Sequence, residues 1–414
     1  MDKNKRLTVW LPVIIAASIA LGIFIGNHYL SISQGKKRSY SSGNKINAIL
    51  DIIDEQYVDT VSMSKLVEST IPKIFSELDP HSVYIPAEDA SVVNEELEGS
   101  FSGIGVSFNM QTDTILVISV ISGGPAEKAG LLPFDRIISI NDSIFSGKKK
   151  NQGEIMKTLR GAKNSTVKLG VQRGNSPELL YFDVTRGDVP VNSVDVSYEA
   201  AKGIGYIKVS KFARNTYNEF ITAIAKLKQA GCTSFVIDLR GNTGGYMDAA
   251  INMINEFMPE GRLIVYTEGK SFPRSDVYAN GTGTCKDAPI VVLTDEISAS
   301  ASEIFSGAIQ DNDRGTIIGR RTYGKGLVQT QMSLSDGSEM RLTIARYYTP
   351  SGRCIQKKYE MGNTDAYDQD IYNRYMHGEF DSADSIKMDD SLKYQTVGGR
   401  TVYGGGGIMP AIFI

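Results

Sequence analysis

Cysteine, histidine and tryptophan are scarce in this sequence, and their scarcity excludes several kinds of site. The 414 residues include three cysteines, three histidines and one tryptophan. An odd number of cysteines at wide spacings provides neither a disulfide framework nor a zinc site. Three histidines are too few for a histidine-based metal cluster, and a Ser-His-Asp triad would have to recruit His81. We therefore expect no metal and no other cofactor.

An excess of one charge is also absent. The chain carries 44 basic and 47 acidic residues, and no basic cluster is interleaved with aromatics, so nucleic acid is not expected as a partner. Neither "RGNTGG" nor "RTYGKG" matches a nucleotide-binding loop, and no G-x-S-x-G supports an α/β-hydrolase elbow. The length suggests two or three domains at ~150 residues each, and 41% hydrophobic content is ample for packed cores.

One long hydrophobic run stands near the N-terminus. Residues 7–26, "LTVWLPVIIAASIALGIFIG", are uncharged and match the ~20 residues that a membrane-spanning helix needs. The run is longer than the ~7–15 residue core of a signal peptide and lacks an Ala-x-Ala exit, so we expect an uncleaved anchor. Basic residues flank it on both sides, so the charge rule leaves its orientation open. We expect residues 1–6 to form a short tail before this run, residues 27–45 a flexible tether, and residues 46–98 a small helical region.

Residues 99–188 change character and predict a small β-rich module with two short helices. The stretches "FSGIGV" and "GPAEKAGL", followed by "DRIISIN", resemble a PDZ domain in its bacterial arrangement. Two glycines alone would favour a hairpin or bulge, and it is the surrounding module that supports the resemblance. It implies that backbone amides of one loop hold a peptide's terminal carboxylate, while the peptide adds as a strand beside a helix. The implied peptide-binding residues are Gly103, Ile104, Gly105 and Val106 in the loop, with Ile155 and Leu159 on the helix.

Residues 189–414 alternate strand-like and helix-like segments. This alternation predicts a mostly parallel sheet flanked by helices, with ligands where strands end and loops begin. The loops "RGNTGG" and "ISASAS" both follow apolar strand-like runs. The fold class is thus mixed α/β and multidomain. The last residues, "GGGGIMPAIFI", end on an apolar run that is typical either of a truncated chain or of a strand that closes the sheet.

The stretch "ISASASEIFSGAIQD" places three serines where an apolar helix begins. A hydroxyl becomes a good nucleophile when a neighbour takes its proton, and a lysine can do so if burial leaves its amine neutral. Lys325 stands between two glycines, and Gln329 follows four residues later as a neutral side chain that can orient the amine. The alternatives are that Ser300 and Glu303 form a helix-capping box and that Lys325 is a solvated loop residue.

These motifs and their order resemble the C-terminal processing peptidases, the tail-specific proteases of the S41 serine-peptidase family. The matching stretches include "LDPHSVYI", "VIDLRGNTGG", "SASASE", "TYGKGLVQ" and "VYGGGGIMP". In this family the base lysine follows the nucleophile by twenty-five positions, which selects Ser300 over Ser298 and Ser302. The resemblance implies Gln329 as the residue that orients Lys325, and the amides of Gly245 and Ala301 as donors to the oxyanion.

The predicted function is that of a membrane-anchored serine endopeptidase with a Ser-Lys-Gln site, whose PDZ domain binds unstructured protein C-termini. The alternative is a non-catalytic, membrane-anchored PDZ adaptor that binds the same tails. The joint presence of Ser300 and Lys325 favours the enzyme, because an inactive scaffold needs neither. The resemblance further implies a catalytic part on the outer, periplasmic side of the inner membrane and assembly into a homo-oligomer.

Overall fold

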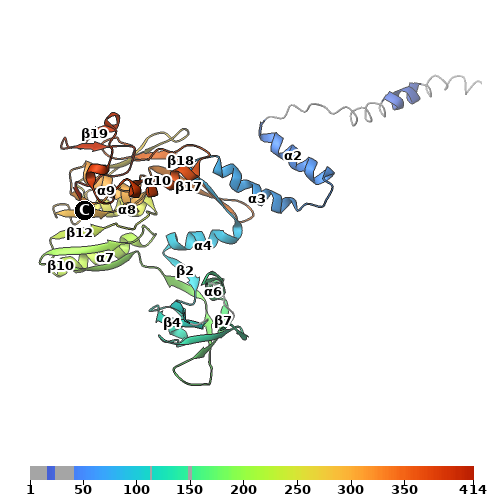
Figure 1. Cartoon of the computed structure of the whole chain (residues 1–414), viewed down its shortest axis with the longest axis horizontal. Coiled ribbons are helices and arrows are strands. Elements are labelled where there is room, and N and C mark those ends of the chain that lie inside the picture. Colours follow the sequence, from blue (N-terminus) through green and yellow to red (C-terminus); the bar gives the residue numbers. More distant parts are fainter. Residues whose placement is uncertain (1–15, 24–41, 112–113, 148–151) are drawn as a thin grey trace, which may run out of the picture. The chain divides into compact units, whose positions relative to one another are not determined.

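The computed structural model describes residues 16–23, 42–111, 114–147 and 152–414 (Figure 1). The chain divides into two compact units, residues 1–70 and residues 71–414. In the first unit, residues 16–23 are helical, α2 spans Ser42–Gln56, and α3 (Met63–Ser76) begins there. No helix among the described residues combines the length and apolar character needed to cross a membrane. Most of the predicted anchor, residues 7–26, lies outside the described residues.

The β-rich module predicted at residues 99–188 forms a six-stranded antiparallel sheet with two short helices. β2 (Ser100–Gly103) and β9 (Gly187–Pro190) pair with each other where the chain enters and leaves it. A hydrophobic cluster fills the module and includes Val117, Ile137 and Leu169, which have no exposed surface. The sheet contains β3 (Val106–Gln111), β4 (Thr114–Val120), β5 (Arg136–Ile140), β6 (Ser143–Ile144), β7 (Thr166–Gln172) and β8 (Leu180–Thr185), and the helices are α5 (Pro125–Ala129) and α6 (Gln152–Leu159).

The remainder of the second unit contains one mixed sheet of six strands, flanked by helices. Its strand order is β10-β11-β12-β15-β16-β21, in which every neighbouring pair from β11 onward is parallel and β10 is antiparallel to β11. The strands are β10 (Val194–Ala201), β11 (Ile204–Val209), β12 (Ser234–Asp238), β15 (Ile290–Thr294), β16 (Thr316–Gly319) and β21 (Ile412–Phe413), and the helices are α7 (Thr216–Gln229), α8 (Met247–Asn255) and α9 (Ala301–Asp311).

A second, antiparallel sheet corrects the prediction of a mostly parallel core. It contains β1 (Val83–Ile85), β13 (Leu263–Glu268), β14 (Ser275–Tyr278), β17 (Leu327–Ser333) and β18 (Glu339–Tyr348). The apolar run "LIVYT" was expected among the parallel strands, but β13 pairs antiparallel with β14 and β18. The parallel prediction therefore applies to one sheet only, and it is wrong for the core as a whole. The expectation of a mixed α/β, multidomain chain is confirmed.

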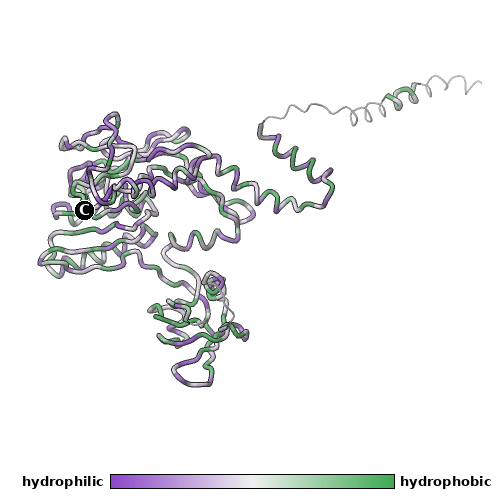
Figure 2. The backbone as a smooth tube through the Cα atoms, in the orientation of Figure 1, coloured by the Kyte–Doolittle hydropathy of each residue, from purple (hydrophilic) through white to green (hydrophobic). Residues whose placement is uncertain are grey.

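The helices of the core follow the expected amphipathic pattern. Phe220, Ile224 and Leu227 of α7 are buried in the main hydrophobic cluster, four and three residues apart. Hydrophobic and hydrophilic residues alternate along most of these elements (Figure 2). Thr216 and Glu219 have the spacing of a capping box at the start of α7, but Glu219 accepts hydrogen bonds from the backbone of Ser193 and Val194 at the start of β10. This contact fixes α7 to the edge strand of the sheet.

Additional elements complete the second unit. α4 (Ala87–Glu98) precedes β2, and α10 (Thr364–Met376) follows β18. Two 3-10 turns, Ala383–Ser385 and Asp390–Leu392, lead to a small hairpin of β19 (Lys393–Gln395) and β20 (Thr401–Tyr403). The final strand, β21, pairs with β16 at the edge of the mixed sheet.

Candidate active site

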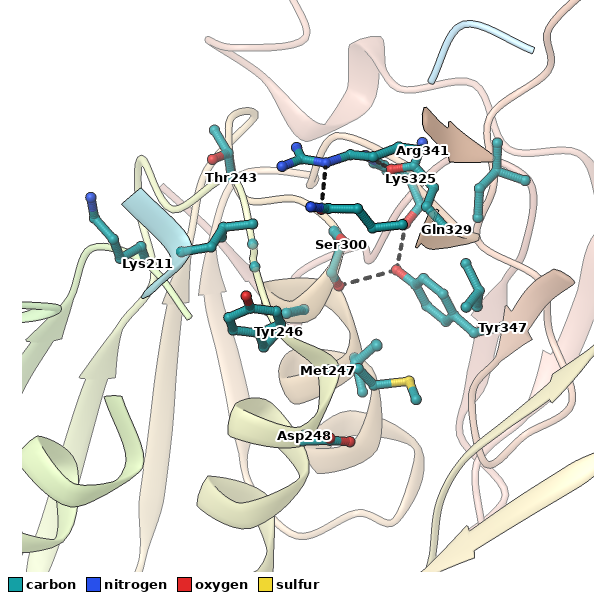
Figure 3. A pocket seen from close by; sticks show the side chains of 18 of the residues that line it. Lys211, Thr243, Tyr246, Met247, Asp248, Ser300, Lys325, Gln329, Arg341 and Tyr347 are labelled. Carbon is teal, nitrogen blue, oxygen red and sulfur yellow. Dashed lines mark hydrogen bonds between the residues drawn. The ribbon is translucent and has the colours of Figure 1, made fainter. Parts of the chain in front are cut away.

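A pocket of about 660 Å³ lies where β12 and β15 end and where the β17–β18 hairpin begins (Figure 3). The loop after β12 supplies one wall and the turn before α9 supplies the floor, as expected for a sheet whose ligands bind at the carboxyl ends of parallel strands. The second sheet supplies the opposite wall. All five residues predicted for catalysis line this one pocket: Ser300, Lys325, Gln329, Gly245 and Ala301.

Ser300 occupies a strained turn between β15 and α9. Its backbone has φ 56° and ψ −114°, a conformation that non-glycine residues rarely adopt and that accumulates at functional sites. Ser300 is also the N-cap residue of α9, and its amide donates to the Glu303 carboxylate at 2.9 Å. The capping and nucleophile interpretations therefore coexist, because the helix start places the side chain near free amides and the positive end of the helix dipole.

The two outer serines of "SASAS" hold the neighbouring loop in place. Ser298 Oγ donates to the carbonyl of Leu239 at 2.8 Å, and Ser302 Oγ donates to the carbonyl of Asn242 at 2.9 Å. Both serines are fully buried. They fasten the "RGNTGG" loop beside Ser300, so three serines are present because one faces the pocket and two attach the loop.

Gly244 and Gly245 are required as glycines by close backbone contacts. A side-chain carbon on Gly244 would lie 2.7 Å from the Cβ of Ser300, and one on Gly245 would lie 2.1 Å from the Phe212 carbonyl oxygen. Both residues have positive φ, 106° and 139°. The Phe212 amide donates to the Gly244 carbonyl, and the Phe212 carbonyl accepts from the Tyr246 amide. In this parallel pairing the amide of the intervening Gly245 points away from Phe212. That amide and the Ala301 amide lie at the same pocket as Ser300.

Lys325 is partly buried, and its amine is held by a neutral group. Its Nζ donates to Gln329 Oε1 at 3.2 Å, and it makes no hydrogen bond to Ser300 Oγ among the described contacts. Catalytic hydrogen bonds are often long without substrate and tighten when it binds. Burial lowers the pKa of the Lys325 amine, and the positive charge of Arg341 lowers this pKa further, against weaker opposing effects of Asp79 and Glu303. The site thus favours a neutral amine.

The stretch "LDPHSVYI" orients Gln329. The Gln329 amide nitrogen donates to the backbone carbonyl of His81, which turns its oxygen toward Lys325. Asp79 fixes this segment by accepting from the His81 amide at 3.0 Å and from Thr343 Oγ1 of β18 at 2.9 Å. The His81 ring does not line the pocket and lies 2.9 Å from the Tyr367 hydroxyl. Burial and the nearby Lys325 lower its pKa to about 4. His81 therefore acts through its backbone, and the structure offers no Ser-His pair.

Glu303 connects the Ser300 turn to the Lys325 loop, a contact that was not predicted. Its fully buried carboxylate accepts from the amides of Ser300, Gly324 and Lys325 at 2.7–2.9 Å and from the Thr322 hydroxyl at 2.5 Å. Burial raises its pKa to about 7 in spite of these donors. The capping-box spacing pointed to Glu303, but only for its own helix. The structure shows that this one carboxylate holds the Ser300 turn and the Lys325 loop together.

Tyr347 and Arg341 are two further pocket residues that sequence reasoning missed. The Tyr347 hydroxyl lies 2.6 Å from the Lys325 carbonyl and 3.1 Å from the Ser300 carbonyl (Figure 3). Arg341 lines the pocket from β18. Both reach the site through the pairing of β18 with β17, which no motif in the sequence indicates.

The residues predicted to bind peptide in the β-rich module are arranged as a loop, an edge strand and a helix. Gly103 ends β2, Gly105 has φ 77°, and Val106 begins β3, an edge strand with one side unpaired by other strands of its sheet. The carbonyl of Ile104 accepts from the Ala126 amide at 2.7 Å. A peptide strand has a free edge to join at β3.

The helix side of this groove stays a prediction. Ile155 has no exposed surface and Leu159 is 4% exposed, and both belong to the module's hydrophobic cluster. They pack inward because α6 has to bury its apolar face on a small sheet. In this conformation the two side chains offer little surface to a peptide.

Known protein families match both the β-rich module and the core that follows it. The profile of peptidase family S41 matches residues 203–365, and the PDZ domain profile matches residues 102–195. The chain is 35% identical over 318 residues to the carboxy-terminal processing protease CtpB of Bacillus subtilis (strain 168), covering 76% of this chain and 66% of that protein. It is 33% identical over 365 residues to a probable CtpA-like serine protease of Staphylococcus aureus (strain N315), covering 86% of this chain and 72% of that protein.

Among solved structures, the photosystem II D1 C-terminal processing protease is 27% identical, with 76% of this chain and 90% of that chain covered and a TM-score of 0.42. The sequence relatives and the two profiles confirm the resemblance on which the predictions rested. The chain belongs to peptidase family S41, the family of C-terminal processing serine proteases, and it contains a PDZ domain.

Proposed function

We propose that this protein is a serine endopeptidase in which Ser300 is the nucleophile, Lys325 the general base and Gln329 the residue that orients the base. One observation carries the proposal: Lys325 is a partly buried lysine that shares the pocket of Ser300 and is held by an amide in place of a carboxylate. A carboxylate partner would stabilise the protonated amine, whereas an amide holds the nitrogen in place and leaves it free to accept a proton.

The geometry supports a two-step acyl transfer. Ser300 Oγ attacks the carbonyl carbon of the scissile peptide bond while its proton passes to the Lys325 amine. The amides of Gly245 and Ala301 donate hydrogen bonds to the oxygen that becomes negative. Lys325 then gives the proton to the departing amine, and the peptide bond breaks to leave an acyl group on Ser300. Water, deprotonated by Lys325, hydrolyses this ester and restores the serine.

Casein hydrolysis by the Ser300→Ala variant tests the proposal. We expect a loss of activity of at least about 10³-fold, because nucleophile and acyl intermediate are both removed. Ser335→Ala, an exposed serine in the β17–β18 loop, is the matched control and should retain full activity. Undiminished hydrolysis by Ser300→Ala would overturn the assignment. Inactive wild-type protein that still binds peptide tails would support the non-catalytic adaptor.

We also propose that the PDZ domain binds free, unstructured C-termini through the Gly103 to Val106 loop and the free edge of β3. A reporter protein with an apolar, disordered tail should be cleaved quickly, and the same reporter with an amidated terminus or an Asp-Asp ending should be cleaved slowly. A change in KM alone would indicate that the domain tethers substrate, and an added change in kcat would indicate that tail binding also activates the site. Equal cleavage of all three reporters would contradict the tail-recognition proposal.

The place of action is a further proposal that rests on residues 7–26 and on the family. We propose that this run anchors the protein in the inner membrane, that the catalytic part lies on the periplasmic side, and that the chain forms a homo-oligomer. Protease accessibility of the catalytic part in spheroplasts tests the orientation, and sedimentation of the detergent-solubilised protein tests the assembly. Release of the protein in soluble form by osmotic shock would contradict the anchor.

A further inference from the structure

The catalytic pocket carries positive charges that no protein carboxylate neutralises. Lys211 and Arg341 both line it, in addition to Lys325 (Figure 3). Across the described parts of the chain, neither Lys211 nor Arg341 has an acidic partner within ion-pair distance. Asp248 is the one acidic residue in the described lining, and it is exposed at the start of α8. The pocket is therefore electrostatically suited to an anionic group of a substrate.

Arg341 faces the pocket because of the strand register. β17 and β18 pair so that Gln331 stands opposite Arg341 and Gln329 stands opposite Thr343. Side chains two residues apart lie on the same face of a strand, so Arg341 shares a face with Gln329, which holds the base. Gln329 accepts a hydrogen bond from the Lys325 amine and all three residues line the pocket, so Arg341 lies on the base side of Ser300.

Neutral amides position the Arg341 guanidinium. Its Nε donates to Gln331 Oε1 and its Nη2 donates to Asn94 Oδ1, both at 3.1 Å. The nitrogens of these two amides donate in turn to Glu339 Oε2, at 2.6 Å from Gln331 and 2.9 Å from Asn94. The amides thus separate the arginine from the nearby carboxylate and fix its direction without cancelling its charge. No described residue accepts a hydrogen bond from Nη1.

We propose that Arg341 binds a carboxylate of the substrate segment that follows the scissile bond. The base must deliver its proton to the departing amine, so the departing segment lies on the side of Lys325, where Arg341 stands. A fixed guanidinium with a free donor suits a carboxylate, with which it forms strong charge-assisted hydrogen bonds. That carboxylate is either an acidic side chain or the chain's own terminus when the departing segment is short. The proposal rests on the proposed protease function and specifies its substrate class.

Arg341 also disfavours protonation of Lys325, and the two roles have different signatures. An effect on Lys325 changes the cleavage of every substrate by the same factor. An effect through carboxylate binding changes only the cleavage of substrates that carry the carboxylate. The informative quantity is therefore the ratio of kcat/KM for an acidic and a neutral peptide, and not the activity itself.

Three peptides of about ten residues test the proposal, built on a cleavage site mapped by mass spectrometry in digested casein. The first has neutral side chains after the scissile bond and an amidated terminus, the second adds one glutamate there, and the third has a free terminus. For the wild-type protein we expect kcat/KM to be roughly tenfold or more higher for the second or third peptide than for the first. Whichever of the two is preferred identifies the source of the carboxylate.

For Arg341→Gln the preference for the glutamate peptide should fall to about one, and any preference for the free terminus should fall to the part that the PDZ domain supplies; for Arg341→Lys the preference should be reduced but retained. Arg274→Gln, the same change at the residue directly before β14 of the same sheet and outside the pocket lining, should leave both activity and preference unchanged. The PDZ domain is the same in all variants, so a difference between them reports Arg341. An equal preference in wild type and Arg341→Gln would overturn the proposal, as would equal cleavage of all three peptides by wild type. Failure of the wild-type protein to digest casein at all would instead contradict the proposed protease function.

Discussion

Two lysines of this protein are both buried to some extent, yet they have opposite surroundings. Lys325 lies at the catalytic pocket, and its amine is held only by Gln329 Oε1. Lys357 is 6% exposed and donates to Asp370 at 3.0 Å, and it lies about 4 Å from the centres of the Tyr323 and Tyr367 rings. Burial lowers the pKa of both amines, but of the two only the Lys357 amine is hydrogen-bonded to a carboxylate and lies against aromatic rings.

The different partners of these two amines show that burial alone does not make a lysine a base. Burial disfavours the charge in both places, and the partner decides whether a proton is retained. Even the carboxylate nearest to the catalytic loops, Glu303, bonds to the backbone amide of Lys325 and not to its amine. The site therefore uses a negative charge to fix the position of the loop while a neutral amide holds the amine.

Replacing Lys325 should have the largest effect on activity. In Lys325→Arg the side chain stays protonated at every accessible pH, so it cannot take the Ser300 proton. We expect casein hydrolysis to fall by about 10²–10⁴-fold, the range usual for a general base. Lys202→Arg, at an exposed turn between β10 and β11, is the control. Substantial activity in Lys325→Arg would exclude the base role.

Glu303→Gln tests whether the carboxylate that bonds to the Lys325 backbone is needed. An amide has one acceptor oxygen in place of two, so some of the four donors lose their partner, at about 1–3 kcal/mol each. We expect a loss of kcat of roughly 10–100-fold with a smaller change in KM. Glu178→Gln, an exposed residue of the PDZ domain, should have no effect. If Glu303→Gln retains wild-type kcat, the carboxylate does not position the two loops.

Gln329→Glu would give Lys325 the kind of partner that Lys357 has. A carboxylate beside the amine raises its pKa, and activity requires the neutral amine, so the rising limb of the pH–rate profile should move to higher pH. At a fixed pH below the shifted pKa, kcat should fall about tenfold for each unit by which the pKa of Lys325 rises. The measurement is kcat against pH for this variant and for Gln395→Glu on the exposed face of β19. An unchanged profile would show that Gln329 does not act on Lys325.

Asp370→Asn removes the carboxylate partner of Lys357. Its effect should be smaller and should appear in the free energy of unfolding. Lys357 keeps its burial but loses its carboxylate, which should cost about 1 kcal/mol near pH 7, discounted because Asp370 is partly exposed. The change lowers the folded-state pKa of Lys357 further, so the deficit should shrink as pH rises toward the unfolded value of ~10.4. Urea unfolding near pH 7 and near pH 10 measures the deficit, and Asp381→Asn, at an exposed position after the same helix, is the control. If the loss of unfolding free energy does not depend on pH, it does not arise from the charge of Lys357.

The sequence was most informative where chemistry and spacing coincide. The glycine-flanked Lys325, Gln329 and the serine-rich turn were predicted as one site, and the structure places them around one pocket. The antiparallel sheet was missed because apolar strand-like runs have the same appearance whichever sheet they join, as β13 shows. Arg341 was missed because its place in the pocket depends on register, which is a property of strand pairing. Ile155 and Leu159 remain a prediction, because one apolar helix face can pack on a sheet or line a groove.

The two sheets of the core divide the catalytic groups between them. The turn after β15 of the mixed sheet contributes Ser300, and the antiparallel sheet contributes Gln329 on β17, with Lys325 in the loop that joins the two. A chain in which only one sheet has formed has a nucleophile without an oriented base, or a base without a nucleophile. Under the proposed mechanism, proteolytic activity therefore requires both sheets to have formed, and we expect partly folded copies to be inactive.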